Sequence, residues 1–421
     1  MAQSHVSTVE IQEYALWDSQ KRQNKFLAFE LEITARCNND CRHCYINVPA
    51  GDAAAKAQEL SPSEILRIAG EAASLGAVWC LVTGGEPLLR PDFPEIYLGL
   101  KRLGLLVSVF TNATPITEEH VALFKRYPPR DIEVTVYGVT KETYERVVRR
   151  PGSFDAFMRG LDRLLAGGVK VRLKAVAIRS NMHEMAEIER FCRARTKDYH
   201  RFDPVMHLRL DGDPARNADI RAERLTPDEV VMLEQADEER FGVLVKNADT
   251  LILPDRPRLS CDECRAYQEP DGDVALAEDA PLFSCGVGAG SFNVSYDGTF
   301  RLCSSLSTPE TTYDLRRGTV REALETVVPR VRAMRTANQA LQRACKSCAY
   351  VKLCRNCPAH AYLETGDMQA IPLYFCQVAH ARGDMLSESL HPSPPEAASH
   401  KPSGCKMEAP RGADAALNSP L

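Results

Sequence analysis

Residues 27 to 210 alternate between short apolar runs and segments with helical spacing of apolar positions. The short runs are rich in β-branched and aromatic residues, whereas the segments between them repeat apolar residues every three or four positions. This alternation is typical of repeated βα units that form a mostly parallel sheet. Six strands are predicted, at residues 27–34, 78–83, 105–111, 132–137, 169–178 and 204–210.

The segments between these runs carry helix start and stop signals. Ser61 and Glu64 form a capping-box pattern with a proline between them, and Gly76 follows the apolar stripe, so a helix is predicted over residues 62–75. A second capping pattern at Thr226 predicts a helix to about residue 240 that bridges to the rest of the chain. Gly104, Ser153 and the pair Gly167-Gly168 bound other predicted helices in the same way.

Six βα units are too few for a closed eight-stranded barrel. We therefore expect an α/β fold, a partial (β/α)6 TIM-like barrel with its functional loops at the C-terminal ends of the strands. Beyond about residue 255 the regular pattern weakens and cysteines become frequent, which predicts a small region with metal clusters in its core. The tail after Leu390 is rich in Pro, Ala and Ser and is predicted to be disordered.

The bulk composition excludes several classes of protein. With 44% apolar and 26% charged residues in 421, the chain has the composition of a soluble globular protein. Its net charge of −5 and the lack of a sustained Lys/Arg run argue against nucleic acid as a partner. The first twenty residues resemble neither a signal peptide nor a membrane span, so we expect a cytoplasmic protein.

The fifteen cysteines are the unusual feature of this composition. Because the cytosol keeps thiols reduced, a disulfide framework is not expected there, and metal ligation is the leading explanation. Most of the cysteines gather near the start of the chain or in its last third. Cys80 falls in a predicted strand and Cys192 in a predicted helix, so both are interpreted as buried, inert thiols.

The first motif is Cys37-x3-Cys41-x2-Cys44, directly after the first predicted strand. Three thiolates around a cluster of four irons leave one iron open, which can then bind a substrate or cofactor. A zinc site and a chance grouping are the alternatives to a cluster.

The second motif is Thr83-Gly84-Gly85-Glu86-Pro87, at the end of the second predicted strand. Its glycines allow close approach of the backbone to a ligand, and Glu86 can pair with a cation such as an ammonium group. A plain strand-to-helix turn is the alternative. Asn112 and Tyr137, which end the next two strands, would face the same cavity.

These two motifs together resemble those of the radical S-adenosylmethionine (radical SAM) superfamily over residues 25 to 210. The resemblance implies that Cys37, Cys41 and Cys44 bind a [4Fe-4S] cluster whose open iron chelates the cofactor's methionine part. It further implies that His43 lies beside the adenine through its backbone, and that Gly84, Gly85 and Glu86 receive the methionyl amino group. Asn112 is counted with the cofactor-binding residues, and no residue is assigned a catalytic role.

A second resemblance covers about residues 280 to 380, where the cysteine spacing is similar to that of the SPASM extension of radical enzymes. It implies two auxiliary [4Fe-4S] clusters, although Cys354 and Cys357 are separated by two residues where the family pattern has three. The inner cluster lacks a fourth ligand, which Cys261 or Cys264 could supply unless one iron stays open for substrate. The implied ligands are Cys345, Cys348, Cys354 and Cys376 for the outer cluster and Cys285, Cys303 and Cys357 for the inner one.

The predicted domain organisation follows from these two matches. Residues 1–24 form an N-terminal extension, 25–215 the radical SAM partial barrel and 216–280 a bridging segment. Residues 281–388 form the SPASM domain with the auxiliary clusters, and 389–421 the tail.

The resemblance implies hydrogen abstraction from a substrate, which for SPASM-type enzymes is mostly a ribosomally made peptide. Implied partners are an external electron donor of the flavodoxin or ferredoxin type and, because only about 25 residues precede the first strand, a separate leader-binding protein, unless the barrel itself binds the leader. Formylglycine formation is an alternative, although Ser304 stands where that group has an aspartate. Small-molecule oxidation, including that of a tetrapyrrole side chain, is another alternative, and a non-catalytic iron–sulfur scaffold or redox sensor is an alternative of a different class.

Several polar residues of the barrel permit two interpretations. His207 and Arg209 on the last predicted strand could approach the cavity, and Lys174 and Arg172 could reach the cofactor carboxylate or lie on the surface. Arg149 is interpreted as part of a solvated loop.

Overall fold

The computed structural model describes residues 26–197, 200–256, 258, 280–338, 341–345, 348–354 and 357–390. The predicted N-terminal extension, the pair Cys261 and Cys264, and the tail from residue 391 onward lie outside the described residues. No helix of the described ranges is both long and apolar enough to span a membrane.

The predicted barrel is a curved sheet in which six parallel strands follow the order β1-β4-β5-β6-β7-β8. Five of these strands lie where the sequence predicted them, and the partial-barrel fold class is confirmed. The sixth prediction was wrong, because the strand ends at Asp203 and residues 204–210 contain none. Pro204 has no N–H to continue the ladder. The six strands are Ala28–Glu32 (β1), Trp79–Thr83 (β4), Leu106–Thr111 (β5), Asp131–Val136 (β6), Val171–Val176 (β7) and Arg201–Asp203 (β8).

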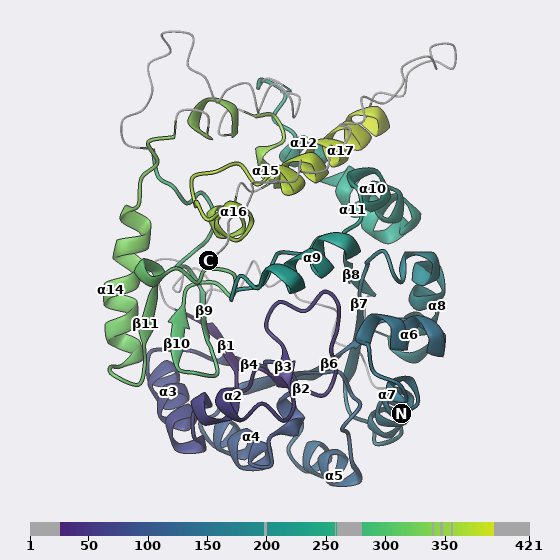
Figure 1. Cartoon of the computed structure of the whole chain (residues 1–421), viewed down its shortest axis with the longest axis vertical. Helices are drawn as coiled ribbons and strands as arrows, with labels where there is room; N and C mark the ends of the chain where they lie inside the picture. Colours follow the sequence, from purple (N-terminus) through teal and green to yellow (C-terminus); the bar gives the residue numbers. More distant parts are fainter. Residues whose placement is uncertain are drawn as a thin grey trace, which may run out of the picture.

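Helices cover the outer face of this sheet (Figure 1). On β1, Phe29 and Leu31 belong to the main hydrophobic core, so Glu30 and Glu32 lie on the opposite, inner face. The loop with the short strands β2 (Arg36–Cys37) and β3 (Val48–Pro49) lies on that inner side. The outer helices are Pro62–Ser74 (α3), Phe93–Arg102 (α4), Glu118–Arg126 (α5), Lys141–Val148 (α6), Ser153–Ala166 (α7) and Met185–Arg195 (α8).

The helix boundaries mostly follow the predicted signals. The capping box of Ser61 and Glu64 is formed at α3, and Gly76 has a φ of 102° behind it. Gly152, with a φ of 76°, is the N-cap of α7, so Ser153 is its first residue rather than its cap. The helix predicted to about residue 240 is two helices, α10 (Pro227–Ala236) and α11 (Glu238–Lys246), because Asp237 accepts a hydrogen bond from the backbone N–H of Arg240 and caps the second one.

The C-terminal region extends the same sheet. Strand β9 (Ser291–Val294) pairs in parallel with β1, and β10 (Thr299–Arg301) and β11 (Thr312–Asp314) continue the sheet antiparallel. This region is more regular than the sequence pattern predicted. Its longer helices are α14 (Val320–Ala333), α16 (Pro358–Thr365) and α17 (Leu373–Leu390), the last of which runs two residues into the predicted tail.

Short elements connect these parts. They are α2 (Ala53–Gln58), α9 (Pro214–Glu223), α12 (Ala248–Leu251), α15 (Val351–Cys354), 3₁₀ turns at Pro87–Leu89, Met182–Glu184 and Pro309–Thr311, and a π-helical turn at Leu341–Cys345. Helix α9 passes across the inner side of the sheet near the loop that joins β2 and β3 (Figure 1).

Candidate functional site

The structure brings the three cysteines of the first motif together on the loop after β1. Burial raises the pKa of the Cys41 thiol well above its usual range, and the neighbouring thiols of Cys44 and Cys37 raise it further. Burial and then the Glu86 carboxyl raise the pKa of Cys37 to about 12. Thiols that oppose one another's ionisation in a buried place become thiolates when a cation binds them. The loop therefore has the donor set of a metal site.

The three thiols do not form a single-ion site in the described part of the chain. Among the described residues, no three His, Cys, Asp or Glu side chains lie close enough together to hold a single metal ion. Thiolates that each bind a different iron of a cube lie farther apart than ligands that share one ion. Three thiols on one loop match the donor set of a [4Fe-4S] cluster with one open iron.

The two glycines of the second motif lie directly against this loop. The N–H groups of Gly85 and Glu86 donate to the carbonyls of Thr34 and Arg36, at 2.7 and 2.9 Å. Gly84 has a φ of 139°, and a Cβ there would lie 2.2 Å from the Thr34 carbonyl oxygen. A Cβ at Gly85 would lie 2.3 Å from the Arg36 carbonyl oxygen. Both positions therefore require glycine, because the backbone of the cysteine loop approaches them closely.

Glu86 connects the ends of two neighbouring strands. Its fully buried carboxylate accepts hydrogen bonds from the N–H of Asn112 (2.7 Å), the N–H of Leu88 (3.1 Å) and the hydroxyl of Thr111 (2.9 Å). Burial raises the pKa of Glu86 to about 7, although these hydrogen bonds lower it. The side chain thus has protein donors already, and its contact with an ammonium group stays a prediction.

Asn112 and His43 both lie at this loop. The Asn112 amide Nδ2 lies 3.8 Å from Cys37 Sγ and donates to Asn38 Oδ1 at 2.9 Å. The His43 ring packs 5.2 Å from the ring of Tyr137, and its Nδ1 is buried without a hydrogen-bond partner. Burial and then Lys174 lower the pKa of His43 to about 4, so the ring is neutral near pH 7.

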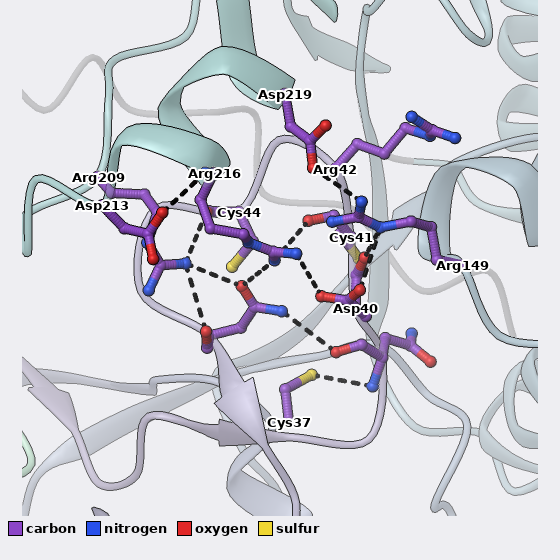
Figure 2. A network of polar contacts seen from close by, with 12 residues as sticks. Cys37, Asp40, Cys41, Arg42, Cys44, Arg149, Arg209, Asp213, Arg216 and Asp219 are labelled. Atoms are coloured by element: carbon purple, nitrogen blue, oxygen red, sulfur yellow. Dashed lines mark hydrogen bonds and ion pairs between the residues drawn. The ribbon is translucent and has the colours of Figure 1, made fainter. Parts of the chain in front are cut away.

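A polar network, which sequence reasoning did not identify, holds the loop on its other side (Figure 2). Asp40 pairs with Arg216 at 2.7 Å and with Arg149 at 3.1 Å, and Arg149 also pairs with Asp219 at 2.7 Å. Arg149 is therefore an ion-paired residue of the site and not part of a solvated loop. A usable signal was Asp213-Pro214, an N-cap followed by proline, which begins the helix that carries Arg216 and Asp219.

The four cysteines assigned to an outer cluster lie around one cavity in the C-terminal region. The cavity is lined by Cys345, Cys348, Tyr350, Val351, Cys354, Cys376 and His380. Three separate segments of chain supply these thiols: the stretch around residue 345, the short helix α15 and helix α17. Their convergence gives this cavity a four-thiol donor set.

The three cysteines assigned to an inner cluster are also neighbours. Burial raises the pKa of Cys357, and the thiols of Cys303 and Cys285 raise it further, while the N–H groups of His360 and Ala359 lower it. The candidates for a fourth ligand, Cys261 and Cys264, lie outside the described residues.

Cys80 and Cys192 are buried thiols, each 1% exposed, as predicted. Burial raises the pKa of Cys80 above its usual range and that of Cys192 to about 12, which keeps both protonated. Lys174 and Arg172 both form ion pairs within the protein, Lys174 with Glu133 (2.5 Å) and Arg172 with Asp131 (3.8 Å).

The family model of the Radical SAM superfamily matches residues 31–192, which include the cysteine loop and the glycine motif. The chain carries a radical SAM domain, and it is an enzyme. Enzymes of this superfamily bind S-adenosylmethionine and a [4Fe-4S] cluster, and the donor set of the loop fits that cluster.

The radical SAM enzyme is similar to relatives that act on different substrates. It is 28% identical over 342 residues to an AdoMet-dependent heme synthase of Methanosarcina barkeri, with 80% of this chain and 92% of the relative covered. It is 28% identical over 162 residues to a PqqA peptide cyclase of Rhizobium meliloti, with 38% of this chain and 42% of the relative covered. The sequence comparisons thus support the enzyme class and leave two substrate classes open.

The fold is also similar to that of a solved enzyme. The crystal structure of Streptococcus suis SuiB bound to its precursor peptide SuiA matches with a TM-score of 0.59 and 16% identity, over 89% of this chain and 85% of that one. The similarity therefore extends beyond the barrel into the C-terminal region.

Proposed function

We propose that this radical SAM enzyme oxidises a peptide, using a [4Fe-4S] cluster on Cys37, Cys41 and Cys44 and two auxiliary clusters in the C-terminal region. The observation that carries the peptide assignment is the charge of the inner barrel face. Carboxylates project from β1 and β6 on this face, and one of them has no ion-pair partner among the described residues.

Two strands supply these carboxylates. Glu133 on β6 pairs with Lys174 at 2.5 Å, and Glu32 on β1 pairs with Arg301 at 3.6 Å. Glu30 on β1 forms no ion pair within the described part of the chain and accepts only a long hydrogen bond, 3.4 Å, from Asn293. Lys174 on β7 still lowers the pKa of Glu30, after burial has raised it, so β1 and β7 face each other across the curved sheet.

This face suits a peptide better than a polycarboxylate. A substrate with several carboxylates would bring like charges beside Glu30, which is unfavourable in a partly buried place. A peptide instead offers N–H groups and, in some side chains, cations that an unpaired carboxylate can accept.

The loop geometry supports the following proposed cofactor contacts. Cys37, Cys41 and Cys44 would hold the cluster, with Gly84, Gly85, Glu86 and Asn112 on one side of the bound S-adenosylmethionine and His43 beside the adenine. When bound, the reduced cluster supplies the electron that cleaves S-adenosylmethionine to methionine and a 5′-deoxyadenosyl radical. The protein's own part is to hold the loop between the glycine motif and the ion pairs of Asp40 with Arg149 and Arg216.

The auxiliary clusters would accept the electron that leaves the substrate radical. Cys345, Cys348, Cys354 and Cys376 would hold the outer cluster and Cys285, Cys303 and Cys357 the inner one, with an open iron or a fourth ligand from Cys261 or Cys264. A flavodoxin or ferredoxin would supply electrons, and a separate protein would bind the leader of the peptide.

A tetrapyrrole is the second candidate substrate. It is supported by the heme synthase relative, of which the similarity covers 92%. Formylglycine formation ranks lower, because the residue after Cys303 is a serine.

The test is to co-express the enzyme with short reading frames encoded beside its gene and to measure the peptide masses. A mass loss of two hydrogens that requires Cys37 supports the peptide assignment. In parallel, iron coproporphyrin III is incubated with the reconstituted enzyme, reductant and S-adenosylmethionine. Turnover of this porphyrin and unchanged peptides would overturn the peptide assignment in favour of the tetrapyrrole.

A further inference from the structure

Two arginines donate to the backbone of the cysteine loop from outside it (Figure 2). Arg209 Nη1 donates to the carbonyl of Cys44 at 3.3 Å, and Arg216 Nη2 donates to the carbonyl of Cys41 at 3.4 Å. Both guanidinium groups also donate to Oδ1 of the buried Asn47, at 3.2 and 3.0 Å. The two cations therefore meet at one amide within the loop.

Asn47 extends these contacts to the third cysteine. Its Nδ2 donates to the Asn39 carbonyl at 3.3 Å, and the Asn39 N–H donates to Cys37 Sγ at 3.4 Å. The network thus touches the chain at or beside each of the three cysteines.

The arginines are themselves fixed by helix α9. The Arg209 N–H donates to Asn217 Oδ1 on α9 at 2.9 Å, and the Arg216 N–H donates to the capping Asp213 at 2.9 Å. Because α9 begins between them, the two guanidinium groups are placed by one rigid element.

Their counter-charges lie toward solvent. Arg209 has a side chain only 4% exposed, whereas Asp211, its partner at 2.6 Å, is 52% exposed. Arg216 is 21% exposed, whereas its partner Asp40 is 55% exposed. Water screens the carboxylates more than the guanidinium groups, so each guanidinium is the less screened charge of its pair, also where the partner, Asp40, belongs to the loop itself.

We propose that Arg209 and Arg216 are positioning residues that fix the cysteine loop and raise the reduction potential of its cluster. The inference rests on the proposed cluster at Cys37, Cys41 and Cys44. Reduction adds one electron to a group that three thiolates already make negative, so a fixed cation nearby stabilises the reduced form more than the oxidised one.

The experiment measures the cluster itself in anaerobically reconstituted enzyme. Arg209→Gln and Arg216→Gln remove a positive charge, whereas Arg209→Lys and Arg216→Lys keep the charge but lose the planar guanidinium with its several hydrogen-bond donors. Arg221→Gln is the matched control, because Arg221 is also on α9 but is 49% exposed and pairs with Glu364 instead of the loop. The readouts are iron per chain and a redox titration of the EPR signal that responds to S-adenosylmethionine.

For each Gln variant we expect about a tenfold lower ratio of reduced to oxidised cluster at a given potential, the size of one charge-assisted hydrogen bond. This ratio corresponds to a potential about 59 mV more negative for one electron. The Lys variants should stay near the wild-type potential, as should Arg221→Gln.

Unchanged potentials in the Gln variants, with iron retained, would overturn the proposal. Equal shifts in the Gln and Lys variants would overturn the electrostatic part, because charge would then not be the cause. If a Gln variant fails to fold, a Lys variant that folds with a wild-type potential supports the proposal, and one with a shifted potential contradicts it. A wild-type enzyme without any signal that responds to S-adenosylmethionine would instead refute the proposed cluster.

Discussion

Gly85 is the position at which one added methyl group should do the most damage to the cofactor site. A Cβ there would lie 2.3 Å from the Arg36 carbonyl oxygen and 2.5 Å from that of Ala35, both backbone atoms next to Cys37. Atoms so close must move apart by several tenths of an ångström, and no side chain can rotate away to make room. Gly85→Ala therefore pushes the cysteine loop away from the end of β4.

The cost has two parts. Overpacking of this kind costs about 1–3 kcal/mol. The hydrogen bonds from the N–H groups of Gly85 and Glu86 to the loop, 2.7 and 2.9 Å long, would be weakened or lost. Each contributes about 0.5–1.5 kcal/mol, so the expected loss is about 2–6 kcal/mol, with a displaced loop that binds less iron.

The assay is urea unfolding of the metal-free chain together with iron per chain after reconstitution. Gly51→Ala is the matched control, since Gly51 lies on the same loop and a Cβ there would have no atom within 4 Å. We expect the control to unfold within about 0.5 kcal/mol of wild type. A Gly85→Ala variant that matches the control in both stability and iron would refute the close approach described above.

Three further predictions concern other parts of the chain. Gly383→Ala places a Cβ 2.4 Å from Cε1 of the buried Tyr350, beside the four-cysteine cavity. Iron analysis should therefore show the loss of about four irons per chain while 5′-deoxyadenosine still forms. Unchanged iron would contradict the packing of α17 on Tyr350. Glu234 is 1% exposed and pairs with Arg240 and Arg382 at 2.6 and 2.7 Å. Glu234→Gln should therefore lower the free energy of unfolding, measured by chemical unfolding, by about 3–5 kcal/mol. A loss below about 1 kcal/mol would argue against these buried ion pairs. Burial raises the pKa of Glu86 from 4.5 to about 7, so the folded state binds this proton more tightly than the unfolded state. The contribution of this group to the stability of the metal-free chain should therefore be greatest below pH 4.5 and should fall by about 3 kcal/mol as the pH rises to 7. Unfolding measured over this pH range should lack that dependence in Glu86→Gln.

Local sequence patterns predicted the barrel well because each strand and helix repeats its own period. They failed where the chain departs from that period, as at Pro204, where the predicted strand has already ended. The pairing of β9 with β1 could not be predicted either, since Ala28 and Ser291 are neighbours only through tertiary structure.

The candidate site also contains residues that local patterns predicted and residues that they missed. The thiols and glycines were predicted because their chemistry is encoded by short spacing, Cys37 to Cys44 and Gly84 to Glu86. Arg216 was missed because its contact with Asn47 joins residues 169 positions apart, and no local pattern distinguishes it from a surface arginine. Arg209 was noted as near the cavity, but its contact with the Cys44 carbonyl required the position of α9.

The measurement that tests the central claim most directly is 5′-deoxyadenosine formation under anaerobic conditions. Reconstituted enzyme is mixed with S-adenosylmethionine and a strong reductant, beside a Cys37→Ala, Cys41→Ala, Cys44→Ala triple variant. Radical chemistry at this loop predicts 5′-deoxyadenosine from the wild type and none from the triple variant. Equal product from both, or none from an iron-loaded wild type, would contradict it.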